Sequence, residues 1–267
     1  MNEDRVRIHI SDTGVATVTM VRSDKHNALD KKMFQALLDA ANEVASNRNI
    51  RAVVLHGDGK SFCSGLDIAS FLMEQGRVED LLVREVNRIA NFAQRAAFDW
   101  SQVPVPVIAA ITGSCFGGGI QIALGADIRI AAPDARLSIM EVKWGLVPDM
   151  AITQTLPRLV GIDVAKELTF TGRVFSGTEA RALGLVTRTS EEPLATALAL
   201  ANEIAYRSPD AVRAAKRLYD ETWTSSDASA ALVLETELQS SLIGGANQVE
   251  AVAAGADNRV PEFTLPQ

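Results

Sequence analysis

The stretch Gly113-Ser114-Cys115-Phe116-Gly117-Gly118-Gly119, together with Ser61-Phe62-Cys63-Ser64-Gly65-Leu66-Asp67, decides the fold of this chain. Each stretch follows an apolar run typical of a β-strand and precedes further apolar residues. Glycine lets the main chain approach a ligand closely, and the first turn of a following helix leaves its N–H groups unpaired. Two such turns can direct backbone N–H groups toward one point, which is the arrangement of an oxyanion hole.

The two turns belong to a longer series of segments that resembles the crotonase superfamily, the fold of enoyl-CoA hydratases and isomerases. These enzymes polarise a thioester carbonyl between two backbone N–H groups and act on the adjacent carbons. The resemblance covers nearly the whole chain. Besides the two turns it includes Arg22-Ser23-Asp24-Lys25-His26-Asn27-Ala28-Leu29, Ser138-Ile139-Met140-Glu141-Val142-Lys143-Trp144-Gly145-Leu146, Phe170-Thr171-Gly172-Arg173, Ala182-Leu183-Gly184-Leu185-Val186 and Pro261-Glu262-Phe263.

The order of apolar patterns predicts an α/β core followed by a helical region. Strands are expected at residues 6–10, 15–20, 52–56, 105–111 and 128–131 and near Leu137, and helices at 31–45, 68–100 and 120–126. Asp12-Thr13-Gly14 indicates a hairpin turn, and Asp30 is the expected N-cap of the helix that follows it. From residue 151 onward the pattern is helical, with breaks at Gly161, Gly172, Gly184, Pro193 and Pro209.

The resemblance turns this pattern into a specific architecture. It implies a ClpP/crotonase-like spiral of ββα units over residues 1–195, which would hold CoA and the active site. Residues 196–267 would form a C-terminal helical region that builds a homotrimer, often paired into a hexamer as a dimer of trimers.

Composition restricts the class of protein further. The 267 residues are 47% hydrophobic and 22% charged, which is typical of a soluble globular chain of one or two domains. The charged start and the short apolar stretches predict a cytoplasmic protein without a membrane span, which would need about 20 apolar residues. A net charge of -7 without a basic run argues against nucleic acid, and nothing favours a membrane.

The resemblance assigns the two oxyanion donors to the backbone N–H groups of Leu66 and Gly118. Because both act through the main chain, the leucine side chain is no obstacle. Each such donor typically stabilises a transition state by about 3 kcal/mol. Asp67, directly after Leu66, is expected to cap a helix or hold the loop in place.

Carboxylates next to these turns decide the chemistry. Hydratases of the superfamily use two glutamates, and this chain has Gln121 at the first position and Glu141 at the second. Glutamine can hold a water by hydrogen bonds but cannot exchange a proton near neutral pH. Asp149, eight residues after Glu141, resembles the acid of dienoyl-CoA isomerases, the closest motif resemblance, and of 3-hydroxyisobutyryl-CoA hydrolases. Those isomerases usually carry an aspartate where this chain has Gln121.

A single glutamate at the Glu141 position also resembles enoyl-CoA Δ3,Δ2-isomerases, in which one carboxylate takes a proton and returns it elsewhere. We therefore expect an enzyme that acts on an acyl-CoA thioester in fatty acid metabolism, with double-bond isomerisation as the preferred reaction. Hydration, thioester hydrolysis and non-catalytic acyl-CoA binding are the alternatives. The competing interpretations are a surface ion pair with Lys143 for Glu141 and a helix cap after Pro148 for Asp149.

The resemblance also implies how the substrate is held. Arg259 could reach the CoA of a neighbouring subunit, or it could belong to a solvated tail. The acyl pocket would be lined largely by residues 68–100. The full set of expected CoA contacts is Lys25, His26, Ala28, Ser64, Gly65, Leu66, Asp67, Ile68 and Arg259, and Gly117, Gln121 and Trp144 are expected to line the substrate pocket.

Other chemistries have little support in the sequence. The glycine clusters complete neither the dinucleotide pattern G-x-G-x-x-G nor a P-loop. His9, His26 and His56 lack metal-ligand spacing and an evident serine partner. Cys63 and Cys115 have no histidine nearby in sequence, so they are expected to be small buried packing residues. We expect no metal and no cofactor besides the CoA that is part of the substrate.

Overall fold

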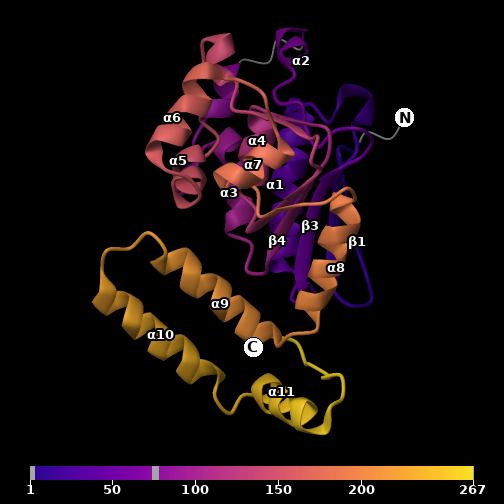
Figure 1. Ribbon diagram of the computed structural model, residues 1–267, viewed down its shortest axis with the longest axis vertical. Helices are drawn as coiled ribbons and strands as arrows, with labels where there is room; N and C mark the ends of the chain where they lie inside the picture. Colours follow the sequence, from indigo (N-terminus) through magenta and orange to yellow (C-terminus); the bar gives the residue numbers. More distant parts are fainter. Residues whose placement is uncertain (1–3, 74–77, 267) are drawn as a thin grey trace.

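The computed structural model describes residues 4–73 and 78–266, and its centre is a six-stranded sheet in the order β1-β2-β3-β4-β6-β9 (Figure 1). β1 (Val6–Ile10) and β2 (Val15–Met20) form the predicted antiparallel hairpin. The other pairs are parallel and comprise β3 (Ala52–Gly57), β4 (Val107–Ile111), β6 (Ile128–Ala131) and β9 (Arg188–Thr189). Parallel strands leave their carboxyl ends on one edge, where ligands bind in α/β folds.

Side chains of the central strands alternate between two apolar layers. In β3, Val53 and Leu55 point into the larger core, and Val54 points into the smaller one. The larger core is covered by α1 (Lys31–Ser46) and α3 (Phe92–Ser101), which pack on each other, and the smaller by α8 (Pro193–Ala205). This two-residue period is what a strand buried on both faces requires. The mixed α/β fold predicted from the sequence is thereby confirmed.

A second sheet consists of three short strands, the first of which lies within the second glycine turn. It is formed by β5 (Ser114–Phe116), β7 (Arg136–Ser138) and β8 (Phe175–Ser176), with β7 in the middle. The sequence pattern did not predict β5 or β8, because strands of two or three residues are too short to show a period. The carboxyl ends of β5 and β7 lead directly to α4 (Gly118–Leu124) and to the 3-10 helix η3 (Glu141–Trp144).

The remaining elements connect and cover these sheets. The predicted N-cap of α1 is confirmed, since the Asp30 carboxylate accepts a 2.7 Å hydrogen bond from the Met33 N–H. Pro193 and Pro209 begin helices rather than only breaking them, as proline does in a first helical turn. The further elements are α2 (Ile68–Met73), α5 (Ile152–Thr155), α6 (Ile162–Thr171), α7 (Gly177–Leu183) and the 3-10 helices η1 (Ser23–Lys25), η2 (Val78–Leu82) and η4 (Leu156–Arg158).

The prediction of a mostly helical stretch over residues 68–100 is wrong for residues 83–91, and residues 74–77 of it lie outside the described residues. Asn87 adopts a left-handed backbone (φ +68°), and Asn91 caps α3 in a capping box with Gln94. The left-handed Asn87 is incompatible with a continuous helix, and Asn91 begins the next one. Val86 and Ile89, whose spacing suggested a helix, are 89% and 78% exposed.

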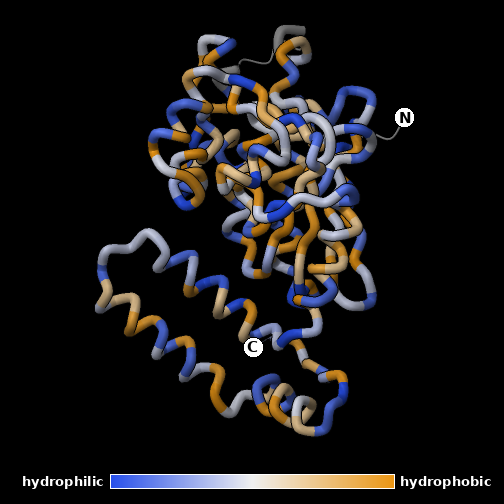
Figure 2. Tube along the Cα trace, viewed as in Figure 1, coloured by the Kyte–Doolittle hydropathy of each residue, from blue (hydrophilic) through white to orange (hydrophobic). Residues whose placement is uncertain are grey.

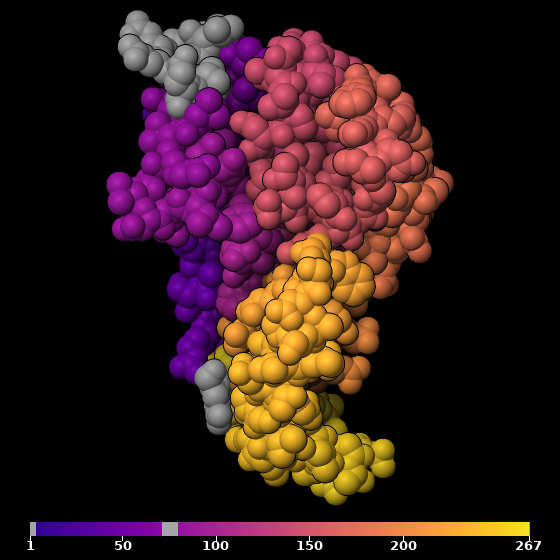
Figure 3. All heavy atoms as spheres, turned by 90° about the vertical axis from the view of Figure 1, so that its left-hand side faces the viewer, coloured from indigo at the N-terminus to yellow at the C-terminus, as the bar shows by residue number. Residues whose placement is uncertain are grey.

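The C-terminal helices lie apart from the sheet as an extended arm (Figures 1 and 3). The arm comprises α9 (Pro209–Thr222), α10 (Ala228–Leu242) and α11 (Ala246–Asp257). Hydrophobic positions recur along α10 (Figure 2), yet Leu234 is its one buried residue. The boundary expected after residue 195 falls inside α8, which packs on the sheet. In the described ranges, no helix combines the length and hydropathy that a bilayer span needs.

Candidate active site

The two glycine turns meet side by side through their cysteines. The Cys63 N–H donates to the Ser114 carbonyl and the Phe116 N–H donates to the Cys63 carbonyl, both at 3.0 Å. A Cβ atom on Gly65 would lie 2.8 Å from the Phe116 carbonyl oxygen, so glycine is required for this contact. Gly65 also has a left-handed backbone (φ +88°). The turns that the sequence marks separately therefore form one site.

Two backbone donors at this junction are unused. Among the described residues, neither the Leu66 N–H nor the Gly118 N–H donates a hydrogen bond, whereas the adjacent Gly117 N–H donates to the Ser138 carbonyl at 3.0 Å. Gly118 is the first residue of α4, where an N–H has no partner within the helix. Free donors at the two predicted positions are what an oxyanion hole needs.

Glu141 places a carboxylate against the same turn. Its Oε1 atom would lie 3.4 Å from a Cβ atom on Gly117, so the missing side chain of this glycine makes room for the carboxylate. The Oε2 atom is shielded from solvent and has no hydrogen-bond partner in the described structure. Lys143 is not among the partners of Glu141, which excludes the surface ion pair considered from the sequence. A buried oxygen without a donor is costly, and a proton relieves that cost.

The environment of Glu141 favours proton exchange. Burial raises the pKa of Glu141 above its ordinary value, and the nearby negative charge of Asp149 raises it further. Hydrogen bonds from its own backbone N–H and from Gln121 act in the opposite direction without cancelling the effect of burial. A carboxyl group whose pKa is raised in this way can both accept and return a proton close to neutral pH.

Gln121 fixes this carboxylate. It lies in α4 with 1% of its surface exposed, donates from Nε2 to Oε1 of Glu141 at 2.6 Å, and accepts the Met150 N–H at Oε1 at 2.8 Å. The two bonds connect α4, η3 and the segment before α5. Gln121 therefore acts as a fixed support at the position where a second acid was considered.

Asp149 lies close enough to Glu141 for its charge to act on it, although Asp149 keeps exposed surface. The surrounding protein removes enough water from Asp149 to raise its pKa as well. It does not cap α5, because Ala151 occupies the N-cap position of that helix. The helix-cap interpretation of Asp149 is therefore wrong. Two acids with raised pKa values near one site are a frequent mark of catalysis.

The segment of residues 22–29 lies along the first glycine turn. The Ser64 N–H donates to the His26 carbonyl at 2.9 Å, and the Leu29 N–H donates to the Gly65 carbonyl at 2.8 Å. His26 and Asn27 hold the turn in a left-handed conformation (φ +50° and +55°). The two segments that hold the expected CoA contacts Lys25, His26 and Ala28 and residues 64–68 are thus brought together.

Asp67 holds this assembly in place, as its position suggested. Its carboxylate accepts from the Ser70 N–H at 3.1 Å at the start of α2 and pairs with Arg22 at 2.7 Å. The hydrogen bonds from Ser70 and the charge of Arg22 keep the pKa of Asp67 below its usual value, although burial opposes them. The Arg22 partner had no signal in the sequence, since it lies 45 positions away.

Two predicted residues lie at the margin of the site or outside it. Trp144 follows Glu141 in η3 and is 63% exposed. Arg259 follows α11 on the arm, where it pairs with Glu250 at 2.6 Å, and Figure 1 shows α11 at the other end of the molecule from α4. Within one chain the structure does not bring Arg259 to the glycine turns.

The structure shows a serine partner for one histidine and the burial of both cysteines. The His26 ring Nδ1 lies 3.0 Å from Ser61 Oγ, so a serine partner exists that the sequence did not show. Residues 35 positions apart give no local signal of such a contact. Cys63 and Cys115 are fully buried, and burial raises the pKa of Cys63 to about 12. Their expected role as packing residues is confirmed.

This site, on this fold, defines a crotonase-type enzyme, and comparisons with known proteins agree. The profile of the enoyl-CoA hydratase/isomerase family matches residues 11–265. Mouse mitochondrial enoyl-CoA hydratase domain-containing protein 2 is 35% identical, over 94% of this chain and 84% of its own. Mouse mitochondrial methylglutaconyl-CoA hydratase is 31% identical, over 98% of this chain and 84% of its own.

A solved structure shows the same fold. The crystal structure of enoyl-CoA hydratase from Bacillus anthracis has a TM-score of 0.86 at 30% identity, and the match covers 97% of this chain and 98% of that one. The chain therefore belongs to the enoyl-CoA hydratase/isomerase family of the crotonase superfamily, whose enzymes act on acyl-CoA thioesters. These relatives are named as hydratases, and the narrower resemblance to dienoyl-CoA isomerases stays a prediction.

Proposed function

We propose that this enzyme moves a double bond along the acyl chain of an enoyl-CoA thioester. The observation that carries the proposal concerns the two positions where hydratases of the superfamily have glutamates. In this chain only the second of them, Glu141, holds an acid. Glu141 offers a buried oxygen without a hydrogen-bond partner and places its other oxygen against Gly117, whereas Gln121 cannot exchange a proton. One proton-exchanging group at these two positions suits a reaction in which the same group removes a proton and returns it.

The proposed reaction begins with the thioester carbonyl. Its oxygen accepts hydrogen bonds from the Leu66 and Gly118 N–H groups, which acidify the α carbon. Glu141 Oε2 removes an α proton from a 3-enoyl ester, and the electron pair of the C–H bond spreads over a dienolate whose charge rests on the carbonyl oxygen. Glu141 then delivers the proton to the γ carbon, which produces the 2-enoyl ester. Each N–H donor is worth about 3 kcal/mol to the charged intermediate.

Gln121 and Asp149 would support this single base. The bond from Gln121 to Oε1 leaves Oε2 without a hydrogen bond in the described structure, so Oε2 would be the oxygen that exchanges protons. Asp149, with its raised pKa, stands where it could serve as a second proton carrier for a longer, conjugated chain. Cofactor chemistry is not needed, because the oxyanion hole supplies the stabilisation of the enolate.

Substrate binding would use the adjacent turns at residues 25–28 and 64–68 for the CoA portion. We infer that the arm assembles with other copies of the chain, since Trp223, Leu232 and Ile243 on it are 66%, 61% and 66% exposed. A homotrimer, or a dimer of trimers, would cover this apolar surface. In such an assembly Arg259 would reach the CoA of a neighbouring subunit.

The test is mass spectrometry of the enzyme in heavy water with 2-enoyl-, 3-enoyl- and 3,5-dienoyl-CoA esters. A shifted double bond is expected, with deuterium in the product wherever the Glu141 carboxyl exchanges its proton with the solvent before returning it, and the Glu141→Gln variant should lose the shift. Glu43→Gln, an exposed change on α1, is the matched control and should retain it. Release of free CoA in place of a shifted bond would contradict the proposal and indicate hydrolysis.

Hydration is the second candidate, because the relatives described above are named as hydratases. Glu141 Oε2 could take a proton from a water whose oxygen adds to the β carbon of a 2-enoyl ester, and then deliver that proton to the α carbon of the enolate. The same experiment separates the two reactions. A product heavier by one water, with no double-bond shift in any ester, would favour hydration over isomerisation.

A further inference from the structure

Three arginines gather at the end of the sheet that lies away from the active site. Arg48 and Arg51 precede β3, whereas the first glycine turn follows it, so the length of the strand, about 20 Å for six residues, separates them. Arg213 reaches them from α9, where its guanidinium lies 3.5 Å from the Ile50 carbonyl oxygen. No step of the proposed reaction uses these residues.

The cluster has more donors than acceptors. Arg51 Nη2 donates to the carbonyls of Phe263 and Thr264 at 3.4 and 3.3 Å, and Arg48 donates to the carbonyl of Pro266. Two further nitrogens, Arg51 Nη1 and Arg213 Nε, are shielded from solvent and have no hydrogen-bond partner in the described structure. A buried donor without an acceptor is energetically costly, and more so when it is charged.

The cluster is also short of negative charge. Asp210, one turn before Arg213 on α9, is the acid that acts on Arg51 and Arg213. Burial and the positive charges of Arg48 and Arg51 lower the pKa of Arg213, and Asp210 opposes them. Guanidinium groups keep their proton in proteins, so these charges persist and repel one another. Among the described residues, three positive charges face one carboxylate, and this excess of positive charge favours the binding of an anion.

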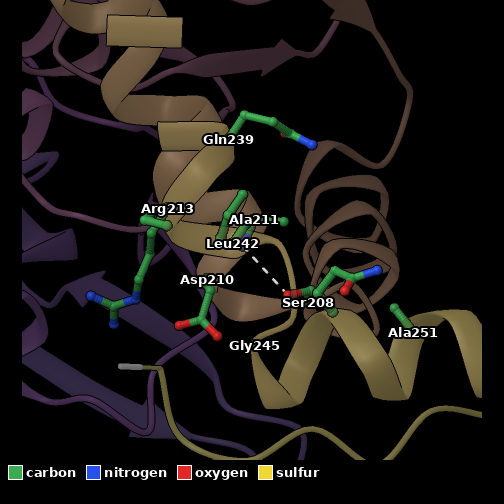
Figure 4. Close-up of a pocket in the computed structure, with 10 residues that line it drawn as sticks. Ser208, Asp210, Ala211, Arg213, Gln239, Leu242, Gly245 and Ala251 are labelled. Carbon is green, nitrogen blue, oxygen red and sulfur yellow. Dashed lines mark hydrogen bonds between the residues drawn. The ribbon is translucent and has the colours of Figure 1, made fainter. Parts of the chain in front are cut away.

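A cavity of about 500 Å³ lies beside the cluster, between the start of α9, the end of α10 and the start of α11 (Figure 4). Figure 4 shows the side chains of Asp210 and Arg213 extending from α9 toward the same side. Ser208, Gln239 and Gln248 add polar groups to the cavity wall. Of the three arginines, Arg213 is the one that lines this cavity, and the volume beside it has room for a group attached to an anion.

We propose that Arg48, Arg51 and Arg213 form a binding site for a phosphate group. A phosphate carries up to two negative charges and several acceptor oxygens, and it matches the fork of guanidinium donors that the cluster leaves unpaired. The phosphate is either the inorganic ion or the end group of a phosphate monoester whose remainder occupies the cavity.

The test is isothermal titration of the full chain, in buffer free of phosphate and sulfate, with inorganic phosphate and separately with adenosine monophosphate. A dissociation constant below about 10 mM is expected for either ligand. Tighter binding of the ester than of inorganic phosphate would assign the cavity to the organic part of the ester. Arg213→Gln should weaken binding by about tenfold, since one charged hydrogen bond is lost. Arg217→Gln is the matched control, because Arg217 is an exposed arginine one turn along the same helix.

Failure of the unaltered chain to bind either anion would overturn the proposal, and this result does not depend on how any variant folds. Equal binding by the Arg213→Gln and Arg217→Gln proteins would overturn it as well, because general surface charge would then explain the effect.

Discussion

Gln121 donates a 2.6 Å hydrogen bond to the carboxylate of Glu141. The bond occupies Oε1, and Oε2 is left without a hydrogen bond in the described structure. Because Gln121 is itself held by the Met150 N–H at 2.8 Å, the carboxylate is positioned by main chain as well as by side chain. Glu141 is thus held in one orientation, with one oxygen bound and the other unpaired.

Gln121→Glu should therefore change the reaction rather than abolish it. Two carboxyl groups at this separation share a proton, which raises the pKa of the pair and shifts the pH profile of isomerisation toward higher pH. The new acid can also protonate or bind water, so hydration of a 2-enoyl-CoA ester should increase by about tenfold or more. The pH dependence of both products, followed by mass spectrometry, is the measurement.

Gln154→Glu on α5 is the control, since it adds the same charge at an exposed position. A profile that moves equally in both variants would show that overall charge, and not the contact with Glu141, causes the shift.

The raised pKa of Glu141 also predicts an effect on stability. The folded state binds a proton at this carboxyl more tightly than the unfolded state does. The ionised form consequently destabilises the fold above the raised pKa, and this cost disappears as the pH falls through it. Glu141→Gln should raise the melting temperature at pH 7, with a smaller gain at pH 5. Thermal unfolding at both values tests this, and a gain that is independent of pH would contradict it.

Much of this site could be predicted from sequence because its parts are local. The two glycine turns, Gln121 and Glu141 each lie in a short segment whose residue types indicate which chemistry that segment can perform. What could not be predicted are contacts between distant segments, such as His26 with Ser61, and the non-helical residues 83–91, where Asn87 and Asn91 outweigh the apolar spacing.

The arm shows another limit of sequence reasoning. The sequence pattern predicted helix after Pro209 but not the breaks at residues 223–227 and 243–245. The apolar residues that usually mark a core remain exposed there, because few described residues of the chain cover them. A period shows which face of a helix is apolar, but it cannot show whether the covering partner lies in the same chain.

Gly65→Ala should damage both fold and catalysis. The added Cβ would lie 2.8 Å from a main-chain oxygen, that of Phe116, and alanine is strained at φ +88°. We expect a loss of about 1–3 kcal/mol of stability and a decrease in kcat of about 100-fold, as the Leu66 N–H moves away from the thioester oxygen. Urea unfolding and steady-state kinetics measure these effects.

Gly244→Ala serves as the matched control for that change. Gly244 has a similar backbone angle (φ +78°), and an added Cβ would meet nothing within 4 Å. It should lose stability through backbone strain alone and keep its kcat. If both variants retained full kcat, the close contact between the two turns would have no part in catalysis.

Asp67 should act on substrate binding more than on the chemical step. Asp67→Ala removes the cap of α2 and the 2.7 Å partner of Arg22, which should cost about 1 kcal/mol of stability and raise KM for an enoyl-CoA by about tenfold, with a smaller change in kcat. Asp39→Ala, an exposed change on α1, is the control.

Asp67→Asn separates the two contributions of this residue, because asparagine caps a helix well but cannot pair with Arg22 as a charge. The lowered pKa of Asp67 means that its ionised form stabilises the fold above its unfolded value of about 3.8, and that this stabilisation is lost as the pH falls through the folded value. The unfolding free energies of the unaltered and Asp67→Asn proteins should therefore differ at pH 7 and converge in acid. A KM that rises in Asp67→Ala but not in Asp67→Asn would assign the effect to the cap, whereas an equal rise in both would assign it to the ion pair that connects Arg22 to the first glycine turn.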